Sequence, residues 1–170
     1  TGAIGAVSAE LLAQAVPQII LIGRRPERLM QVKARCEAAG AEVQVATDLN
    51  ALRQADLILT VTSAMDSVIE PEHLKSGAVV CDVARPRDVS KKVIEQRDDV
   101  LVIEGGMVEV PGDVDFHFNF GFPPRMAYAC MAEAMALALD GRYESYTLGK
   151  DLTIEKVQEM DRVARYHGVT

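Results

Sequence analysis

The chain has 170 residues, of which 49% are hydrophobic and 25% are charged, a composition typical of a globular domain and not of disordered or fibrous proteins. Its net charge of −7 argues against nucleic-acid binding, which requires a clustered basic surface. No apolar run approaches the ~20 residues that a membrane-spanning helix needs. The three cysteines, Cys36, Cys81 and Cys130, form no CxxC pair and no disulfide-like pattern, so we expect no metal site and reduced thiols in a cytoplasmic protein.

The first hundred residues alternate short apolar runs with helical segments, which is the pattern of βαβ units on a parallel sheet. Apolar residues at helical spacing predict a first helix over residues 4–16. Pro26 is typical of the first turn of a second helix, which ends near Gly40. Strands are expected at residues 19–22, 43–46, 57–61, 78–82 and 100–103, and short helices at 49–54, 71–77 and 89–96.

After Gly106 the alternation ends. An irregular or extended tract comes next, and two helices follow it, the first strongly apolar and the second amphipathic. The expected ranges are 107–122 for the tract, 123–140 for the apolar helix and 153–167 for the amphipathic helix. We therefore predict a dinucleotide-binding domain over residues 1–122 and a C-terminal helical segment over 123–170.

The strand count is one short of the expected fold. A doubly wound nucleotide-binding sheet has six strands, and its first, central strand leads directly into the glycine loop. This chain opens on that loop at Thr1. The sequence thus predicts a Rossmann-type α/β fold, with the first strand and an upstream substrate domain expected before Thr1.

The opening segment Thr1-Gly2-Ala3-Ile4-Gly5 has the spacing of the last two glycines of a phosphate-binding loop. Glycines in such a loop let the backbone approach a pyrophosphate, and the helix that follows directs its N–H groups at the anion. The alternative is an ordinary helix start with small residues. The βαβ context favours a cofactor-binding loop.

Two arginines, Arg24 and Arg25, follow the first predicted strand. Sites specific for NAD carry an acidic residue at this position to bind the ribose 2′-hydroxyl. An arginine instead binds a 2′-phosphate and stacks on adenine, so the sequence favours NADP. The alternative is a solvated basic loop.

A polar segment, Thr60-Val61-Thr62-Ser63, ends the third predicted strand. Ligands of open α/β sheets bind outside the carboxyl ends of the strands, so we expect this segment to contact the cofactor. Hydroxyl residues after a strand can also simply cap a turn.

Taken together, the sequence resembles the C-terminal half of the long-chain acyl-[acyl-carrier-protein] reductase family and its bacterial relatives, which are similar to shikimate dehydrogenases in architecture. The matching stretches are residues 1–5, 23–29 (GRRPERL), 79–89 (VVCDVARPRDV), 104–109 (EGGMVE), 124–135 (PRMAYACMAEAM) and 152–168 (LTIEKVQEMDRVARYHG). The tract at 110–122 departs from the cyanobacterial members.

The resemblance implies NADPH-dependent reduction of a fatty acyl thioester, carried by acyl carrier protein or coenzyme A, to an aldehyde. It also implies that Cys130 takes up the acyl group. The local sequence alone favours a different role for Cys130. It lies about two turns into the predicted helix 123–140, too far from the helix start for the helix dipole to lower the pKa of its thiol. Its apolar neighbours are typical of a core residue. Glu133, at i+3 on the same helix face, is a candidate base or a structural carboxylate.

Two alternatives to thioester reduction remain. One is an oxidoreductase similar to shikimate or amino-acid dehydrogenases, which transfers hydride without a covalent step. The other is a module that senses NADP(H) without turnover. Both predict cofactor binding, and only thioester reduction requires a nucleophilic Cys130.

Overall fold

The structure, a computed structural model, describes residues 2–147 and 152–170. The chain divides into two compact units, Thr1–Gly105 and Gly106–Thr170. Thr1, the first residue of the predicted glycine loop, lies outside the described residues. None of the helices in the described part is long and apolar enough to cross a membrane.

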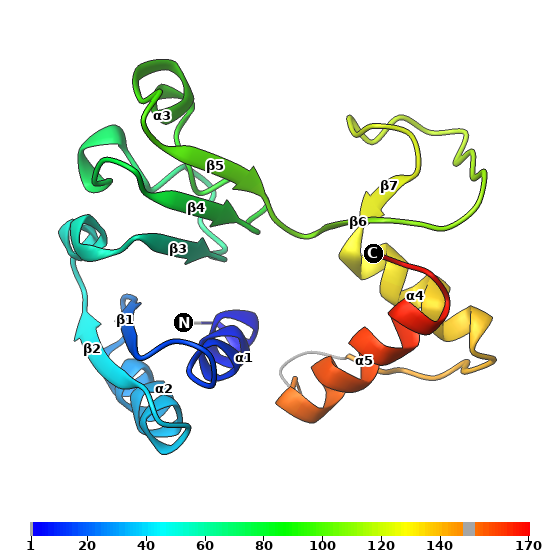
Figure 1. Ribbon diagram of the computed structural model, residues 1–170, viewed down its shortest axis with the longest axis horizontal. Coiled ribbons are helices and arrows are strands. Elements are labelled where there is room, and N and C mark those ends of the chain that lie inside the picture. Colours follow the sequence, from blue (N-terminus) through cyan, green and yellow to red (C-terminus); the bar gives the residue numbers. More distant parts are fainter. Residues whose placement is uncertain (1, 148–151) are drawn as a thin grey trace. The chain divides into compact units, whose positions relative to one another are not determined.

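The first unit confirms the predicted α/β fold with parallel strands (Figure 1). Its elements are α1 (Ala3–Leu12), β1 (Gln18–Ile22), α2 (Pro26–Ala38), β2 (Glu42–Ala46), η1 (Leu49–Gln54), β3 (Leu57–Thr60), η2 (Pro71–His73), β4 (Val79–Asp82), α3 (Lys91–Gln96) and β5 (Leu101–Glu104). Pro26 occupies the first turn of α2, where its missing N–H costs no hydrogen bond. The third helix is shorter than expected because Ser90 caps it, its side chain accepting from the Lys92 N–H.

The strands form two parallel groups, β1-β2 and β3-β4-β5. In a doubly wound sheet the six strands lie in the order 3-2-1-4-5-6. The observed order matches this arrangement if β1 to β5 are strands 2 to 6. The place of the first strand, between β1 and β3, is filled by none of the described residues.

Two hydrophobic clusters lie on opposite faces of this sheet. Leu21 belongs to the cluster formed with α1 and α2, whereas Ile22 packs against the cluster formed with η1, η2 and α3. Successive residues of a strand point to opposite faces, so these neighbours in β1 separate the two layers. Helices therefore wind on both sides of the sheet, as expected for this fold.

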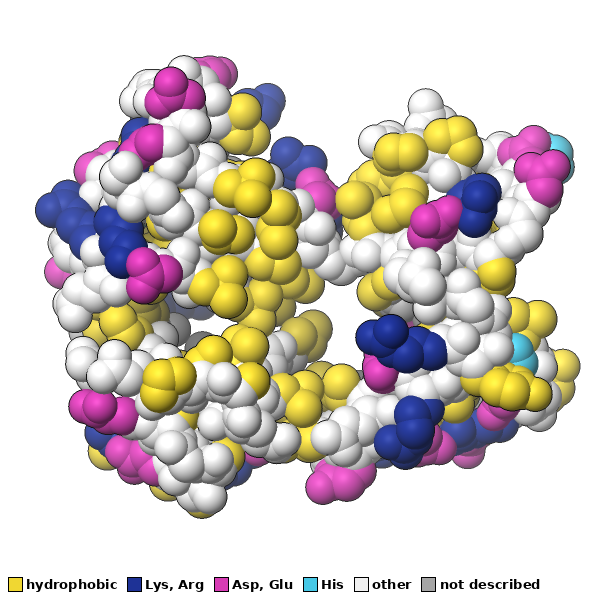
Figure 2. Space-filling model, viewed as in Figure 1, with side chains coloured by type: hydrophobic (Ala, Val, Ile, Leu, Met, Phe, Trp, Pro, Cys, Tyr) yellow, Lys and Arg dark blue, Asp and Glu magenta, His cyan; other side chains and the backbone are white. Residues whose placement is uncertain are grey.

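One sheet face of β3-β4-β5 is uncovered in the first unit. Leu57 and Leu59 on β3, and Leu101 and Ile103 on β5, are all exposed and share one face through the strand register. Figure 2 shows hydrophobic side chains gathered over these strands. Parallel sheets are normally covered on both faces.

The second unit contains β6 (Met107–Glu109), β7 (Met126–Tyr128), α4 (Ala129–Leu139) and α5 (Ile154–Tyr166). The predicted helix over 123–140 is wrong in its first third, residues 123–128. Arg125 has a φ of 68°, which a right-handed helix excludes, and residues 126–128 pair antiparallel with β6. The helix therefore begins at Ala129. The predicted boundary after residue 122 does not coincide with the division between units, because β6 and β7 join the start of the tract to the C-terminal helices.

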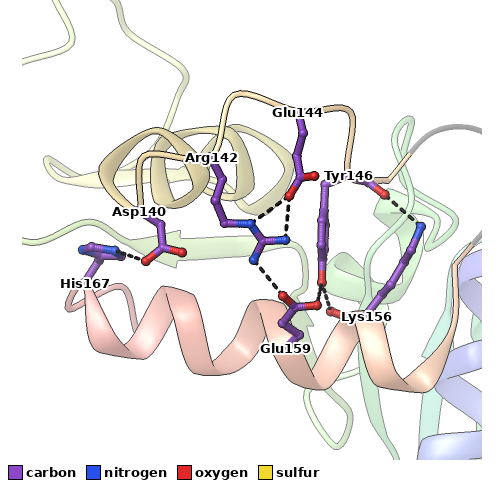
Figure 3. A network of polar contacts seen from close by, with 7 residues as sticks. All are labelled: Asp140, Arg142, Glu144, Tyr146, Lys156, Glu159 and His167. Carbon is purple, nitrogen blue, oxygen red and sulfur yellow. Dashed lines mark hydrogen bonds and ion pairs between the residues drawn. The ribbon is translucent and has the colours of Figure 1, made fainter.

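A polar network links the end of α4 to α5 (Figure 3). Arg142 bonds Glu159 at 2.7 Å, and the buried Tyr146 hydroxyl donates to the same carboxylate at 2.7 Å. Burial, and then the Glu159 carboxylate, raise the pKa of Tyr146 to about 12. The other members are Asp140, Glu144, Lys156 and His167. This network fixes the segment that follows α4 against α5.

Candidate functional site

The start of α1 lies beside the end of β3. A Cβ atom at Gly5 would come within 3.2 Å of the Val61 side chain, whereas one at Gly2 would enter open space. Gly5 therefore permits close packing between the glycine loop and the segment Thr60–Ser63, both of which the sequence predicts to contact the cofactor. Gly2 caps α1 without a side-chain bond, so the N–H groups of the first turn, which includes Ala3 and Ile4, have no side-chain cap. This helix start suits an anionic ligand.

Arg24 and Arg25 follow β1 and are both exposed. Within residues 2–147 and 152–170, neither guanidinium has a hydrogen bond or ion pair. Arginines that stabilise a fold usually have a partner, so this exposed pair is free to bind a phosphate.

The carboxyl ends of β3, β4 and β5 carry one polar residue each. Thr60, Asp82 and Glu104 are register partners, so they form a row across the end of the sheet. Thr60 and Asp82 are buried. This is the edge at which α/β sheets bind ligands.

Asp88 organises the segment after β3. It is fully buried, and it accepts hydrogen bonds from the Thr60 hydroxyl, the Thr62 N–H at 2.9 Å and the Thr62 hydroxyl at 2.5 Å. Both threonine hydroxyls are thus used inside the protein, which favours a positioning role for them. Among the predicted contacts, Ser63 is exposed and Val61 packs on Gly5.

The sequence analysis missed Asp88 and Asp82. Asp82 accepts from the Ala84 N–H and from the Val89 N–H, both at 3.0 Å, and so folds the loop after β4 back onto its own strand. The sequence does show Asp82 at the end of a predicted strand and, after two intervening residues, the stretch Arg-Pro-Arg-Asp that ends in Asp88. The structural role of these aspartates could not be predicted, because it depends on contacts with residues that are distant in sequence. Two buried carboxylates therefore shape this edge of the sheet.

Two arginines of the same loop, Arg85 and Arg87, both form ion pairs with Glu104 at the end of β5. Arg87 bonds it at 2.5 Å. Glu104 thereby ties the loop after β4 to the neighbouring strand. Hydrogen bonds to the buried Asp82 and Asp88 and surface ion pairs to Glu104 therefore both fix the loop after β4.

Cys130 is exposed and occupies the second position of α4, two residues after Tyr128, which is the N-cap residue. The expectation that it lies two turns into a helix is wrong, because residues 126–128 form β7 instead. Cys130 is thus in the first turn, where the helix dipole favours negative charge and no side chain caps the N–H groups. Cys130 is also not a core residue.

Glu133 lies one helical turn after Cys130. Its carboxylate accepts a hydrogen bond from the Thr147 hydroxyl at 2.5 Å. Among residues 2–147 and 152–170, this predicted carboxylate therefore has a neutral hydrogen-bond partner and forms no ion pair. The two candidate catalytic residues share one face of α4.

The other two cysteines differ from Cys130. Cys36 is fully buried, and burial, followed by the Glu10 carboxylate, raises the pKa of its thiol. Burial and then Asp82 raise the pKa of the Cys81 thiol. Both therefore favour the unreactive thiol form.

Comparisons with known proteins agree with this geometry. The profile of the shikimate/quinate 5-dehydrogenase family matches residues 1–104. A long-chain acyl-[acyl-carrier-protein] reductase from Synechococcus elongatus is 32% identical over 159 residues, which cover 90% of this chain and 45% of the reductase. The aminotransferase PigE of a Serratia strain is 37% identical over 115 residues, which cover 66% of this chain and 13% of that protein. The chain thus spans less than half the length of either relative.

The doubly wound strand order, the uncapped helix start and the polar row at the sheet edge are the features of a Rossmann-type NAD(P)-binding domain. The chain belongs to the shikimate/quinate 5-dehydrogenase family, whose profile covers the whole of the sheet described above.

Proposed function

We propose that this chain carries the cofactor site and the nucleophile of an NADPH-dependent enzyme that reduces a fatty acyl thioester to an aldehyde through an acyl group bound to Cys130. The observation that carries the proposal is the exposed Cys130 in the first turn of α4. The similarity to an acyl-[acyl-carrier-protein] reductase over 90% of the chain supports it.

The proposed preference for NADP rests on Arg24 and Arg25. Both side chains are exposed at the end of β1, and neither has a partner among the described residues. We assign them to the 2′-phosphate, and the N–H groups of the first turn of α1 to the pyrophosphate. When bound, NADPH would supply the hydride that reduces the acyl group.

The proposed covalent step uses only residues of the second unit. The Cys130 sulfur attacks the thioester carbonyl, the bond to the carrier thiolate breaks, and that thiolate takes up a proton and leaves. Cys130 must first lose its own proton, and Glu133, one turn away on the same face, is the proposed acceptor. Thr147 would hold this carboxylate in place.

The remaining parts of the proposal concern what lies outside this chain. The substrate is an acyl group on acyl carrier protein or coenzyme A, in the cytoplasm. Residues before Thr1 would supply an upstream substrate domain and the strand between β1 and β3, since that place in the sheet order is not filled by the described residues.

An acylation experiment tests the covalent step. The intact protein is incubated with an acyl-CoA in the absence of NADPH, and its mass is measured. We expect an acyl adduct that is absent from Cys130→Ala, is retained in Cys36→Ala and forms more slowly in Glu133→Gln. Adding NADPH should release the aldehyde. No adduct with any acyl donor would contradict the proposal and leave hydride transfer without a covalent step, or cofactor sensing, as the function.

A separate experiment tests cofactor preference. Replacing Arg24 and Arg25 together by alanine should weaken NADPH binding about 10- to 100-fold, because charge-assisted bonds to the phosphate are lost. NADH binding should change little. Lys91→Ala, another exposed cation of the same unit, serves as the control. If NADPH and NADH affinities fall equally, the arginines do not recognise the 2′-phosphate.

A further inference from the structure

All 4 phenylalanines of the chain lie in one short segment, at alternate positions from 116 to 122. Three of them, Phe116, Phe118 and Phe120, form a chain of rings. The centroid of Phe120 lies 5.6 Å from that of Phe116 and 4.9 Å from that of Phe118. Phe118 is 69% exposed, and residues 116–122 include no Asp, Glu, Lys or Arg. Figure 2 shows hydrophobic side chains gathered over the segment before β7.

The ring cluster leads to the candidate nucleophile. Tyr128 contacts Phe122 at a centroid distance of 4.8 Å and Phe120 at 6.2 Å. Tyr128 is also the N-cap of α4, two residues before Cys130, so their Cα atoms lie at most about 7 Å apart. The apolar surface therefore begins next to the first turn of the helix that carries the thiol.

The segment is held in a defined shape. The Val110 N–H donates to the Arg125 carbonyl, which closes the base of the loop beside the β6–β7 pair. Within the loop, the Asn119 side chain accepts from the Gly121 N–H at 2.7 Å. An exposed aromatic surface held by such contacts, and not folded into a core, suits an apolar ligand.

We infer that the aromatic cluster, residues 116–122 with Tyr128, binds the hydrocarbon chain of the acyl group while its thioester carbonyl lies at Cys130. This inference rests on the proposed function. It predicts a preference for long acyl chains and assigns that preference to residues of this chain, to Phe118 in particular, because its ring is the most exposed of the four phenylalanines.

The test compares long and short acyl donors on the intact protein. The rate of Cys130 acylation is measured with hexadecanoyl-CoA, below its micelle concentration, and with butanoyl-CoA. Phe118→Ser should slow acylation by the long donor about tenfold and leave the short donor unchanged, since only the long chain reaches the ring. Phe118→Leu should restore most of the rate. The control is Tyr143→Ser, which removes a ring that is 87% exposed in the same unit.

A binding measurement separates this inference from the proposed function. In a Cys130→Ala background, calorimetry with hexadecanoyl-CoA should show about tenfold weaker binding for Phe118→Ser, with no change for coenzyme A alone.

If the parent protein is acylated but Phe118→Ser affects both donors equally or neither, the aromatic site is wrong and the proposed function stands. If no donor acylates Cys130, the proposed function fails, and unchanged hexadecanoyl-CoA binding would then overturn the site as well. A change of oligomeric state in Phe118→Ser without a change in chain-length preference would identify the cluster as a contact between copies and overturn the inference.

Discussion

The two units of this chain use polar groups in opposite ways. In Thr1–Gly105, Asp82 and Asp88 are buried, and their oxygens accept from backbone N–H groups and threonine hydroxyls. In Gly106–Thr170, the carboxylates of Glu133 and Glu159 lie nearer the surface and bond side chains of neighbouring segments. Buried acceptors fix a backbone path, because losing one leaves donors without a partner. The comparison indicates a rigid sheet edge in the first unit and a more adaptable second unit.

The largest expected effect tests the rigid half of this comparison. Asp88→Ala should lower the free energy of unfolding by about 3 kcal/mol, because the buried Thr60 hydroxyl is left without an acceptor and the Thr62 N–H and hydroxyl also lose theirs. Denaturant titration measures the loss. Asp66→Ala, an exposed aspartate after the same strand, is the control. Equal stability of the two variants would mean that Asp88 does not fix this segment.

A second effect concerns thiol reactivity in the two units. Iodoacetamide should modify Cys130 at least about tenfold faster than Cys36 or Cys81, because Cys130 is exposed whereas burial raises the pKa of the other two thiols. Peptide mapping over time measures each rate. Cys130→Ser should abolish the fast phase. A fast reaction at Cys81 would contradict the view that thiols of the first unit are structural.

The smallest expected effect lies in the α4–α5 network. Tyr146→Phe should cost about 1 kcal/mol, since the Glu159 carboxylate keeps its bond to Arg142 after the hydroxyl is lost. The folded pKa of Tyr146, about 12, is above its usual value of 10.0. Its contribution should therefore be complete below pH 10.0 and disappear as the pH rises towards about 12.

Ultraviolet difference spectra at increasing pH would follow tyrosinate formation. Tyr146 should give a late ionisation step, and Tyr146→Phe should remove that step. A late step that persists in this variant would show that another tyrosine is responsible. The exposed Tyr143→Phe is the matched control, because its ring is 87% exposed.

The sequence predicted the first unit better than the second for a physical reason. Strands buried on both faces are continuous apolar runs, and a proline such as Pro26 is typical of the first turn of a helix. The residues from Met126 to Leu139 are also apolar apart from Glu133, and no periodicity separates a three-residue strand from the helix that follows it. Arg125 has a left-handed backbone conformation, which excludes a helix through residues 123–128. An arginine gives no indication of this conformation in the sequence.

The candidate site was predictable where a local motif carries the chemistry. Gly2, Gly5 and the pair Arg24 and Arg25 could be proposed from the sequence because their spacing is set by one loop and one strand end, and their role in cofactor binding stays a prediction. Asp88 was not found because its hydrogen-bond partners are 26 and 28 residues away in sequence. For Cys130, the residue was identified from the resemblance, but its place in the first turn of α4 depended on the strand that the sequence did not reveal.

The link between the two units has a consequence for motion. Gly105 has no room for a side chain, since a Cβ atom would come within 2.6 Å of Val83, and its N–H donates to the Asp82 carbonyl at 2.8 Å. The carbonyl of the next residue, Gly106, accepts from the Ala129 N–H at 2.8 Å, at the start of the helix that bears Cys130. Each glycine is thus anchored to a different unit. Any change in the relative orientation of the two units would therefore have to include rotation about the backbone bonds next to the Gly105–Gly106 peptide, because the groups on either side of it are held by hydrogen bonds within their own unit.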